Sequence, residues 1–166
     1  MRTFKGTFRA PTEEDVRQVA EHMRMADRRE LKRWTGQEPG YELKHSIDCS
    51  DKCYAGVFED GRVACIFGAC RVNLLDNTAT IWSLSSTEVD RHPIEFYLGS
   101  KAGLDLIFRE MSDVQFFANF VDLEYESAVN WLERLGFDTS LEAKRAGLRG
   151  GVFGQLYTIN PYYKED

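Results

Sequence analysis

The side chains best suited to chemistry in this sequence gather in one polar stretch, residues 85–96. Arg91 supplies a cation for an anionic ligand, His92 carries a ring nitrogen that can take up a proton, and Glu88 carries a carboxylate that can do so through a water molecule. Pro93 suits the first position of a helix, which Asp90 is placed to cap. These residue types could support anion binding and proton transfer at the start of a helix. A lone surface histidine, however, more often has no such role.

A second group of charges lies near the N-terminus of the chain. It is the basic cluster Arg28, Arg29, Lys32 and Arg33, all within one expected helix. Such a cluster can bind an anion or a partner protein, and these four residues are our candidates for partner binding. The competing interpretation is a solvated helix face, with Glu30 among the basic residues.

Two other patterns suggest ligand binding but have simpler explanations. Four glycines lie within residues 147–154, and the backbone N–H groups of such a segment can cradle an anion. No Gly-Lys-Ser/Thr sequence follows, so the alternative is a turn that leads into a last strand. The four cysteines, at positions 49, 53, 65 and 70, lack the two-residue spacing typical of a zinc site. We therefore expect free thiols and no metal.

Hydrophobic periodicity and turn residues predict alternating strands and helices along the chain. Thr12 is an expected N-cap, and Asp60-Gly61 is a strong turn signal between two apolar runs. The expected strands cover residues 2–9, 54–58, 63–68, 80–84, 116–121 and 153–159, and the expected helices cover residues 12–23, 26–34, 91–111 and 125–135. At 166 residues the chain is long enough for a single domain, residues 1–166, with a proper core.

The clearest unit is the strand and helix between Phe116 and Phe137. The helix carries an apolar stripe at positions i, i+3, i+4 and i+7, made of Ala128, Trp131, Leu132 and Leu135. Gly136 then stops the helix as a C-cap glycine does, and Phe137 is placed to fold back on its last turn. We expect Trp131 and Leu135 to be buried against the sheet.

This unit resembles the closing half of the GCN5-related N-acetyltransferase (GNAT) fold, whose usual sequence motif there is N-x-x-A-x-x-x-Y-x-x-x-G-F. Ala128, Gly136 and Phe137 match, whereas Tyr125 stands in the asparagine position and Leu132 in the tyrosine position. The segment from Trp131 to Phe137 is also similar to small GNAT-like proteins of short-tailed bacteriophages, which are described as internal virion proteins or acetyltransferases. The resemblance implies an α/β fold with a central mixed, mostly antiparallel sheet and helices on both faces.

The resemblance also implies a site for acetyl-CoA at residues 85–96. There the family has R/Q-x-x-G-x-G/A, whose glycines let backbone N–H groups approach the pyrophosphate. Arg91 matches the basic position, and Arg91 and His92 are the candidates for cofactor binding. Ile94 and Phe96 fill the two glycine positions and Glu88 adds negative charge. We therefore expect acetyl-CoA to bind weakly or not at all.

The catalytic position is altered as well. The family's tyrosine gives a proton to the departing CoA thiolate, and Leu132, in its place, cannot carry a proton. Tyr125 and Glu88 are the remaining catalytic candidates. In enzymes of this fold the region of the basic cluster lines the acceptor site.

The composition bears on location and on partners. A net charge of −6 at pH 7 argues against a general nucleic-acid-binding protein. No apolar run approaches the roughly 20 residues of a membrane span, and the N-terminus lacks a signal-peptide core. We expect no membrane association and, with the resemblance to phage proteins, location in the host cytoplasm or in the virion.

Two functions follow from these observations. The altered loop and Leu132 favour a phage protein that acts mainly through a protein partner, in virion assembly or on a host target, with its acetyltransferase chemistry lost or weakened. The alternative is an active acetyl-CoA-dependent N-acetyltransferase with an atypical cofactor loop.

Overall fold

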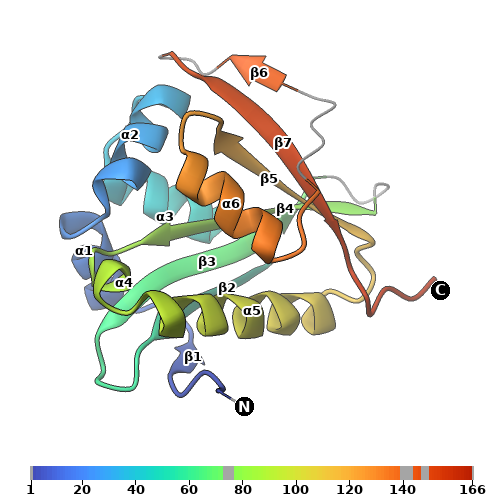
Figure 1. The fold of residues 1–166 in the computed structure, drawn as a ribbon, viewed down its shortest axis with the longest axis horizontal. Coiled ribbons are helices and arrows are strands. Elements are labelled where there is room, and N and C mark those ends of the chain that lie inside the picture. Colours follow the sequence, from blue (N-terminus) through green and yellow to red (C-terminus); the bar gives the residue numbers. More distant parts are fainter. Residues whose placement is uncertain (1, 73–76, 139–143, 147–149, 166) are drawn as a thin grey trace.

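The computed structural model describes residues 2–72, 77–138, 144–146 and 150–165. Within these residues seven strands form one sheet in the order β1-β2-β3-β4-β5-β7-β6 (Figure 1). Neighbouring strands are antiparallel except for β4 and β5, which are parallel. The strands are β1 Thr7–Arg9, β2 Lys52–Val57, β3 Val63–Arg71, β4 Thr78–Ser85, β5 Phe116–Asp122, β6 Lys144–Ala146 and β7 Val152–Ile159. The predicted mixed, mostly antiparallel sheet is confirmed.

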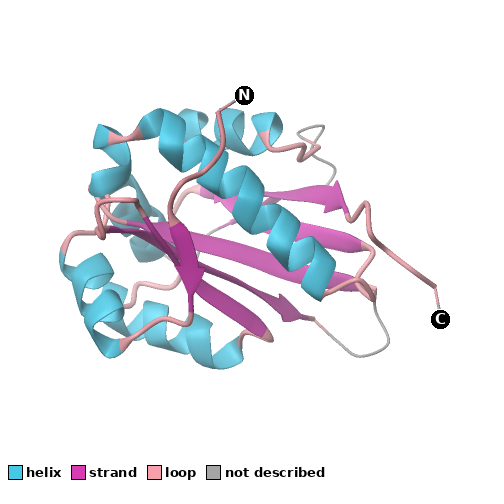
Figure 2. Ribbon diagram, turned by 90° about the horizontal axis from the view of Figure 1, so that it is seen from below, coloured by secondary structure: helices cyan, strands magenta, loops and turns pink. Residues whose placement is uncertain are grey.

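Helices cover both faces of this sheet (Figures 1 and 2). They are α1 Glu13–Glu21, α2 Met25–Trp34, α3 Pro39–Cys49, α4 Glu88–Arg91, α5 Pro93–Glu110 and α6 Glu126–Arg134. On one face α5 and α6 pack against the sheet through Leu104, Ile107 and Leu132. On the other face α1 and α3 pack through Val19 and Leu43.

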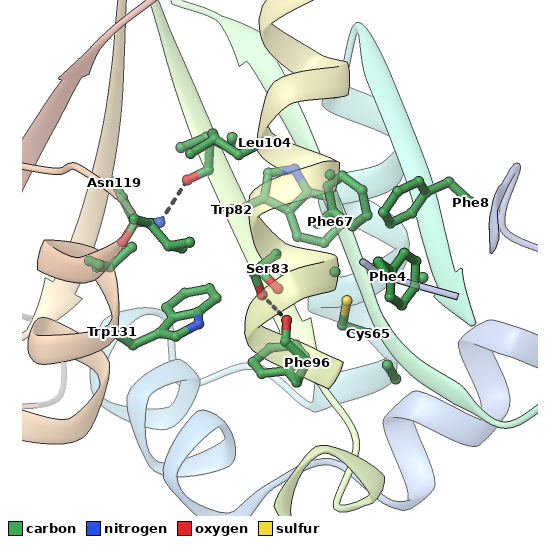
Figure 3. A pocket seen from close by; sticks show the side chains of 18 of the residues that line it. Phe4, Phe8, Cys65, Phe67, Trp82, Ser83, Phe96, Leu104, Asn119 and Trp131 are labelled. Carbon is green, nitrogen blue, oxygen red and sulfur yellow. Dashed lines mark hydrogen bonds between the residues drawn. The ribbon is translucent and has the colours of Figure 1, made fainter. Parts of the chain in front are cut away.

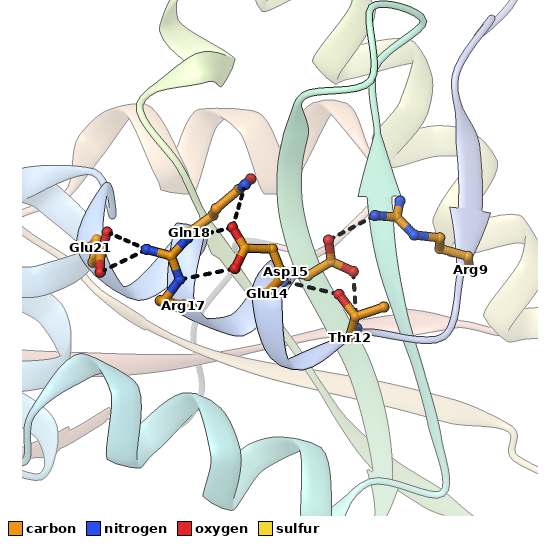
Figure 4. Close-up of polar contacts among 7 residues, drawn as sticks. All are labelled: Arg9, Thr12, Glu14, Asp15, Arg17, Gln18 and Glu21. Atoms are coloured by element: carbon orange, nitrogen blue, oxygen red, sulfur yellow. Dashed lines mark hydrogen bonds and ion pairs between the residues drawn. The ribbon is translucent and has the colours of Figure 1, made fainter.

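The start of α1 follows the sequence prediction. Thr12 caps the helix: its hydroxyl accepts a hydrogen bond from the Asp15 amide, and the Asp15 carboxylate accepts one from the Thr12 amide (Figure 4). Arg9 of β1 pairs with the buried Asp15 at 2.7 Å, so the same carboxylate ties the first strand to the first helix. Arg17 pairs with Glu14 and Glu21 on the exposed face. A capping box thus fixes where the chain turns from β1 into α1.

The end of α6 is also as predicted. Gly136 has a φ of +99°, and the Phe137 amide donates to the Leu132 carbonyl, which is the arrangement of a glycine C-cap. The apolar stripe faces inward, but Leu132 is its buried member, while Trp131 and Leu135 are only partly buried. The expectation of a buried Trp131 is therefore corrected: its ring forms part of the wall of a cleft.

Other predictions need correction. The sequence gives no signal that we recognised for α3, which forms one wall of the second core. The expected helix at residues 91–111 is present as α5, which begins at Pro93, and a separate single turn, α4, that was not predicted precedes it. Much of the glycine-rich segment, residues 147–149, lies outside the described residues.

Candidate active site

A cleft opens where the two parallel strands part. β4 and β5 pair only over three residues, Thr78–Thr80 with Phe116–Ala118, and the Asn119 side chain then bridges the strands by donating to the Ile81 carbonyl at 2.8 Å. Beyond this bridge the strands enclose a cleft of about 460 Å³. Because backbone polar groups alternate along a strand, the N–H and C=O of Ser83 point to the same side as those of Ile81. Ser83 therefore presents hydrogen-bonding groups to the cleft.

Helix α2 closes the cleft at the carboxyl ends of both strands. The Asp27 carboxylate accepts a hydrogen bond from the Ser85 amide, at the end of β4, at 2.9 Å. The Glu30 carboxylate accepts one from the Asp122 amide, at the end of β5, at 3.1 Å. Both acidic side chains line the cleft. One turn of helix thus places two carboxylates across the gap between the strands.

The surroundings of these two carboxylates keep them partly protonated near neutral pH. Burial raises the pKa of Asp27 to about 6, against the opposing effect of the Ser85 amide. Burial likewise raises the pKa of Glu30 to about 7, and the nearby negative charges of Asp27 and Asp122 add to the effect. Carboxylates tuned in this way in a cleft are typical of groups that accept and release protons.

Tyr125 lies in the same cleft. It precedes α6, and the Arg24 guanidinium lies 5.9 Å from the centre of its ring. Burial raises the pKa of the Tyr125 phenol to about 12, and the negative charge of Asp27 acts in the same direction. The phenol therefore keeps its proton at neutral pH and sits within electrostatic reach of the carboxylates.

The opposite wall of the cleft comes from α5 and α6. Phe96 and Trp131 stack with ring centres 5.5 Å apart and planes 7° apart, and Arg134 also lines the cleft. The indole N–H of Trp131 is buried and has no acceptor among the described residues. A buried donor without a partner is costly to a protein, so this atom indicates a place for a ligand's oxygen.

The other residues predicted for the cofactor and for catalysis lie outside the cleft. Glu88 pairs with Arg62 at 3.1 Å and, more distantly, with Arg91. The Arg91 side chain is 70% exposed. His92 precedes α5 and packs on the Phe58 ring at 4.9 Å. Of the catalytic candidates, only Tyr125 lines the cleft.

The loop before α5 differs from a glycine cradle in a specific way. Several of its amides donate to carbonyls within the protein: the Thr87 amide donates to the His22 carbonyl after α1, and the Asp90 amide donates to the Thr87 carbonyl in the turn α4. The side chain of Ile94, in a family glycine position, is 57% exposed and does not fill the cleft. Phe96, in the other position, is part of the cleft wall. The expectation that the lost glycines weaken acetyl-CoA binding remains a prediction.

The basic cluster makes contacts within the protein. Arg28 donates to the carbonyls of Met23, Ala20 and Glu21 and so caps the C-terminal end of α1. Arg29 and Arg33 pair with Glu124 at 2.6 and 2.8 Å, and Arg33 also pairs with the buried Asp122 at 2.8 Å. Lys32 is exposed. The first three cations thus hold α2 in place; partner binding by the cluster remains a prediction.

Metal and membrane sites have no candidate among the described residues. No group of three or more possible metal ligands occurs there. The four cysteines form no disulfide, and Cys65 is buried. No helix in the described part of the chain has the length and apolar character needed to cross a membrane.

Comparison with known proteins identifies the fold. No family model and no curated protein matches the sequence. Among solved structures, spermidine N-acetyltransferase from Vibrio cholerae in complex with CoA and spermine has a TM-score of 0.66 at 16% identity, covering 96% of this chain and 98% of that one. Ribosomal-protein-S5-alanine acetyltransferase from Vibrio fischeri has a TM-score of 0.69 at 14% identity, covering 99% and 98%. A phosphinothricin acetyltransferase of the GNAT superfamily from Sinorhizobium meliloti, in complex with acetyl-CoA, has a TM-score of 0.70 at 14% identity, covering 96% and 90%.

These matches correct one prediction and leave others open. The interpretation of a scaffold that acts mainly through a protein partner, with its chemistry lost or weakened, is wrong: nearly the whole chain superimposes on acetyltransferases, and the cleft between β4 and β5 is open. Phage origin, location in a host or virion and a protein partner remain predictions from the resemblance. The chain has the GNAT acetyltransferase fold.

Proposed function

We propose that this protein is an acetyl-CoA-dependent N-acetyltransferase that acts on a positively charged amine. The observation that carries the proposal is the pair Asp27 and Glu30, held across the open ends of β4 and β5 by backbone amides. The cleft that they close runs from these carboxylates to the wall made by α5 and α6. The cleft can therefore take the amine that accepts the acetyl group at the α2 end and the acetyl donor at the other end.

The described residues fit the donor in four respects. The exposed edge of β4 at Ser83 can pair with the amides of the pantetheine arm, as a strand would. The unpaired indole N–H of Trp131 can donate to a carbonyl oxygen of the donor. In the first turn of α5 the amides of Ile94 and Glu95 have no hydrogen-bond acceptor within the helix, and the positive end of the helix dipole favours a negatively charged group there. Arg91, before this turn, and Arg134 can add cations for the phosphates. When bound, acetyl-CoA supplies an acetyl group activated as a thioester.

Glu30 is the proposed general base. An amine attacks a carbonyl carbon only after its ammonium form has lost a proton, and a carboxylate with a pKa of about 7 is well matched to that transfer near neutral pH. Asp27, one helical turn away, holds the ammonium group by its charge. Arg29 and Arg33 pair with Glu124 and Asp122, and Arg24 pairs with Asp90. Among the described residues that line the cleft, Asp27 and Glu30 are therefore the carboxylates without an ion pair, and they are left to attract a cation.

Tyr125 is the proposed general acid. During transfer the amine nitrogen forms a bond to the acetyl carbon, the carbon–sulfur bond breaks, and the thiolate takes a proton from the phenol. Of the two protons that the ammonium group loses, one passes through Glu30 to solvent and the other restores the Tyr125 phenol. A pKa of about 12 keeps the phenol protonated until the thiolate forms.

The charge of the cleft predicts which acceptors are used. Two carboxylates at the acceptor end favour a polyamine, which remains positively charged beside the reacting nitrogen, and disfavour an acceptor with acidic groups. Spermine is bound in one of the matched structures, which supports this class of acceptor. Phosphinothricin, named for another matched enzyme, carries anionic groups and should be a poor acceptor here.

The test is acetyl transfer from acetyl-CoA to spermidine, followed by thiol release and by mass spectrometry of the product. We expect acetylated spermidine, no product from phosphinothricin, and a loss of about 10²-fold or more in kcat for Glu30→Gln and Tyr125→Phe. The matched control is Glu133→Gln, because Glu133 is exposed on α6 and does not line the cleft. Unchanged kcat in both cleft variants, or no transfer to any amine, would overturn the proposal.

A further inference from the structure

An apolar chamber of about 70 Å³ lies between the sheet and α5 (Figure 3). Its walls are mainly aromatic and aliphatic and include Phe4, Phe67 and Leu104. Two of the polar groups beside it are already engaged: the Ser100 hydroxyl donates to the Phe96 carbonyl at 2.6 Å, and the Cys65 thiol is hydrogen-bonded with Ser83. Trp131, which also lines the chamber, carries the indole N–H that has no acceptor among the described residues. An apolar cavity of this kind does not hold ordered water. It suits an apolar ligand.

The chamber is continuous with the cleft of the proposed active site. Five residues line both spaces: Ser83, Phe96, Asn119, Trp131 and Leu132. Figure 3 shows Trp131 and Asn119 on the side of α6 and β5, and Phe67 and Phe4 on the opposite side of the view, next to Phe8. A group that enters between β4 and β5 therefore meets the mouth of the chamber before it meets the core.

Glycines in α5 set the width of the chamber. A Cβ atom on Gly103 would lie 2.9 Å from the Phe67 ring, and one on Gly99 would lie 2.9 Å from the Phe4 ring. Both glycines thus bring α5 as close to these rings as packing allows. The space that remains beside them is unfilled in spite of this close approach, and an unfilled cavity normally lowers stability.

We propose that this chamber receives the acyl chain of the donor, so that acyl-CoA donors of four or five carbons are better substrates than acetyl-CoA. An engineered cavity of about 150 Å³ takes up benzene, which has six carbons, so about 70 Å³ holds roughly three carbons. Three carbons beyond the acetyl group make a pentanoyl chain. The inference rests on the proposed acyl transfer and adds the class of acyl group; the bonds that form and break are the same.

The test compares acetyl-, butyryl-, pentanoyl- and decanoyl-CoA in two measurements. One is the dissociation constant by titration calorimetry without acceptor, and the other is the rate of thiol release with spermidine. Burial of one methylene contributes about 0.8 kcal/mol, or about fourfold in affinity. We therefore expect affinity to rise about fourfold for each added carbon up to pentanoyl-CoA and to fall at decanoyl-CoA. Equal affinities, or a fall from acetyl- to butyryl-CoA, would overturn the assignment.

Variants of α5 locate the effect in the chamber. Ser100→Met fills the space and should remove the preference for longer chains, with acetyl-CoA affinity unchanged within about twofold. Ala102→Met, on the same helix but away from the chamber, should keep the wild-type preference. Leu104→Ala enlarges the chamber and should shift the preferred donor to a longer chain. The same chain-length preference in all three variants would refute the chamber as the acyl site.

The outcomes separate this inference from the proposed function. If acetyl-CoA binds and is used while longer donors are rejected, the enzyme proposal stands and the acyl chamber does not. If no thioester binds and none is consumed, the proposed function itself fails.

Discussion

Glu30 should control the pH dependence of the reaction. The log of kcat/KM should rise with pH up to about 7 and then level off, because the free enzyme needs Glu30 ionised while the acceptor binds in its ammonium form. Glu30→Gln should remove the rise between pH 6 and 8. Initial rates over this range, with Glu133→Gln in parallel, provide the measurement. A wild-type profile that is flat over this range would contradict the role of Glu30.

The same carboxyl should also affect stability, in a direction that its pKa fixes. Its ordinary pKa is 4.5 and its folded pKa about 7, so the folded protein binds more protons between these values, and the free energy of unfolding falls as pH rises through them. A glutamine side chain at this position can still accept a hydrogen bond from the Asp122 amide, but it cannot ionise. Glu30→Gln should therefore be more stable than wild type by about 1–3 kcal/mol at pH 8 and about equal at pH 4.5. Urea unfolding at both pH values tests this; no gain at pH 8 would show that Glu30 is not desolvated.

The sequence pointed to one of the cleft residues, Tyr125, and to neither carboxylate. Asp27 and Glu30 stand among four basic residues, where they resemble the paired charges of a surface helix. Their environment depends on amides that are 58 and 92 residues away along the chain. A pattern within the helix carries no information about such contacts. Glu88 and His92 were chosen from local chemistry, and the fold places both outside the cleft.

At the scale of elements, the position of α2 depends on two ion pairs of different depth. Arg33 pairs with Asp122, whose side chain is only 3% exposed, whereas Arg29 pairs with Glu124, which is 60% exposed. Arg33→Met should lower the free energy of unfolding by about 2–4 kcal/mol because it leaves a buried carboxylate unpaired. Arg29→Met, the matched control, should lower it by about 0–1 kcal/mol. Thermal or urea unfolding of both variants tests this difference; equal effects would contradict it.

Elements with strong local signals were predicted, and the others were not. The hairpin at Asp60-Gly61, the capped α1 and the glycine stop of α6 are each specified within a few residues. Helix α3 has few apolar residues and no side-chain cap, and its burial comes from Leu43 packing against α1 and β3. The cleft itself is a property of two strands that part after three paired residues. Such a divergence depends on what packs on either side of the sheet, so the strand sequences alone do not reveal it.

At the scale of the molecule, the sheet consists of two parts joined along a short seam. Strands β1 to β4 form one part, and β5, β7 and β6 form the other. The seam comprises the three paired residues of β4 and β5, the Asn119 bridge to Ile81, and α2 across the far end. Amides along the open edges near Ser83 and Phe120 have no strand partner across the gap. A ligand in the cleft should supply hydrogen-bond partners for these amides and so hold the two parts of the sheet together.

Hydrogen exchange should detect this closure. Addition of acetyl-CoA should slow amide exchange in peptides that cover residues 82–86, 93–98 and 119–125, because these segments line the cleft. Exchange in α1 should be unchanged, since α1 packs on the other core and does not line the cleft. Leu132→Arg, which places a charge in the wall between the cleft and the chamber, should abolish the protection; Glu133→Gln, its neighbour on the outer face, should preserve it. Protection confined to α1, or none at a concentration that saturates binding, would show that the donor does not occupy the gap between β4 and β5.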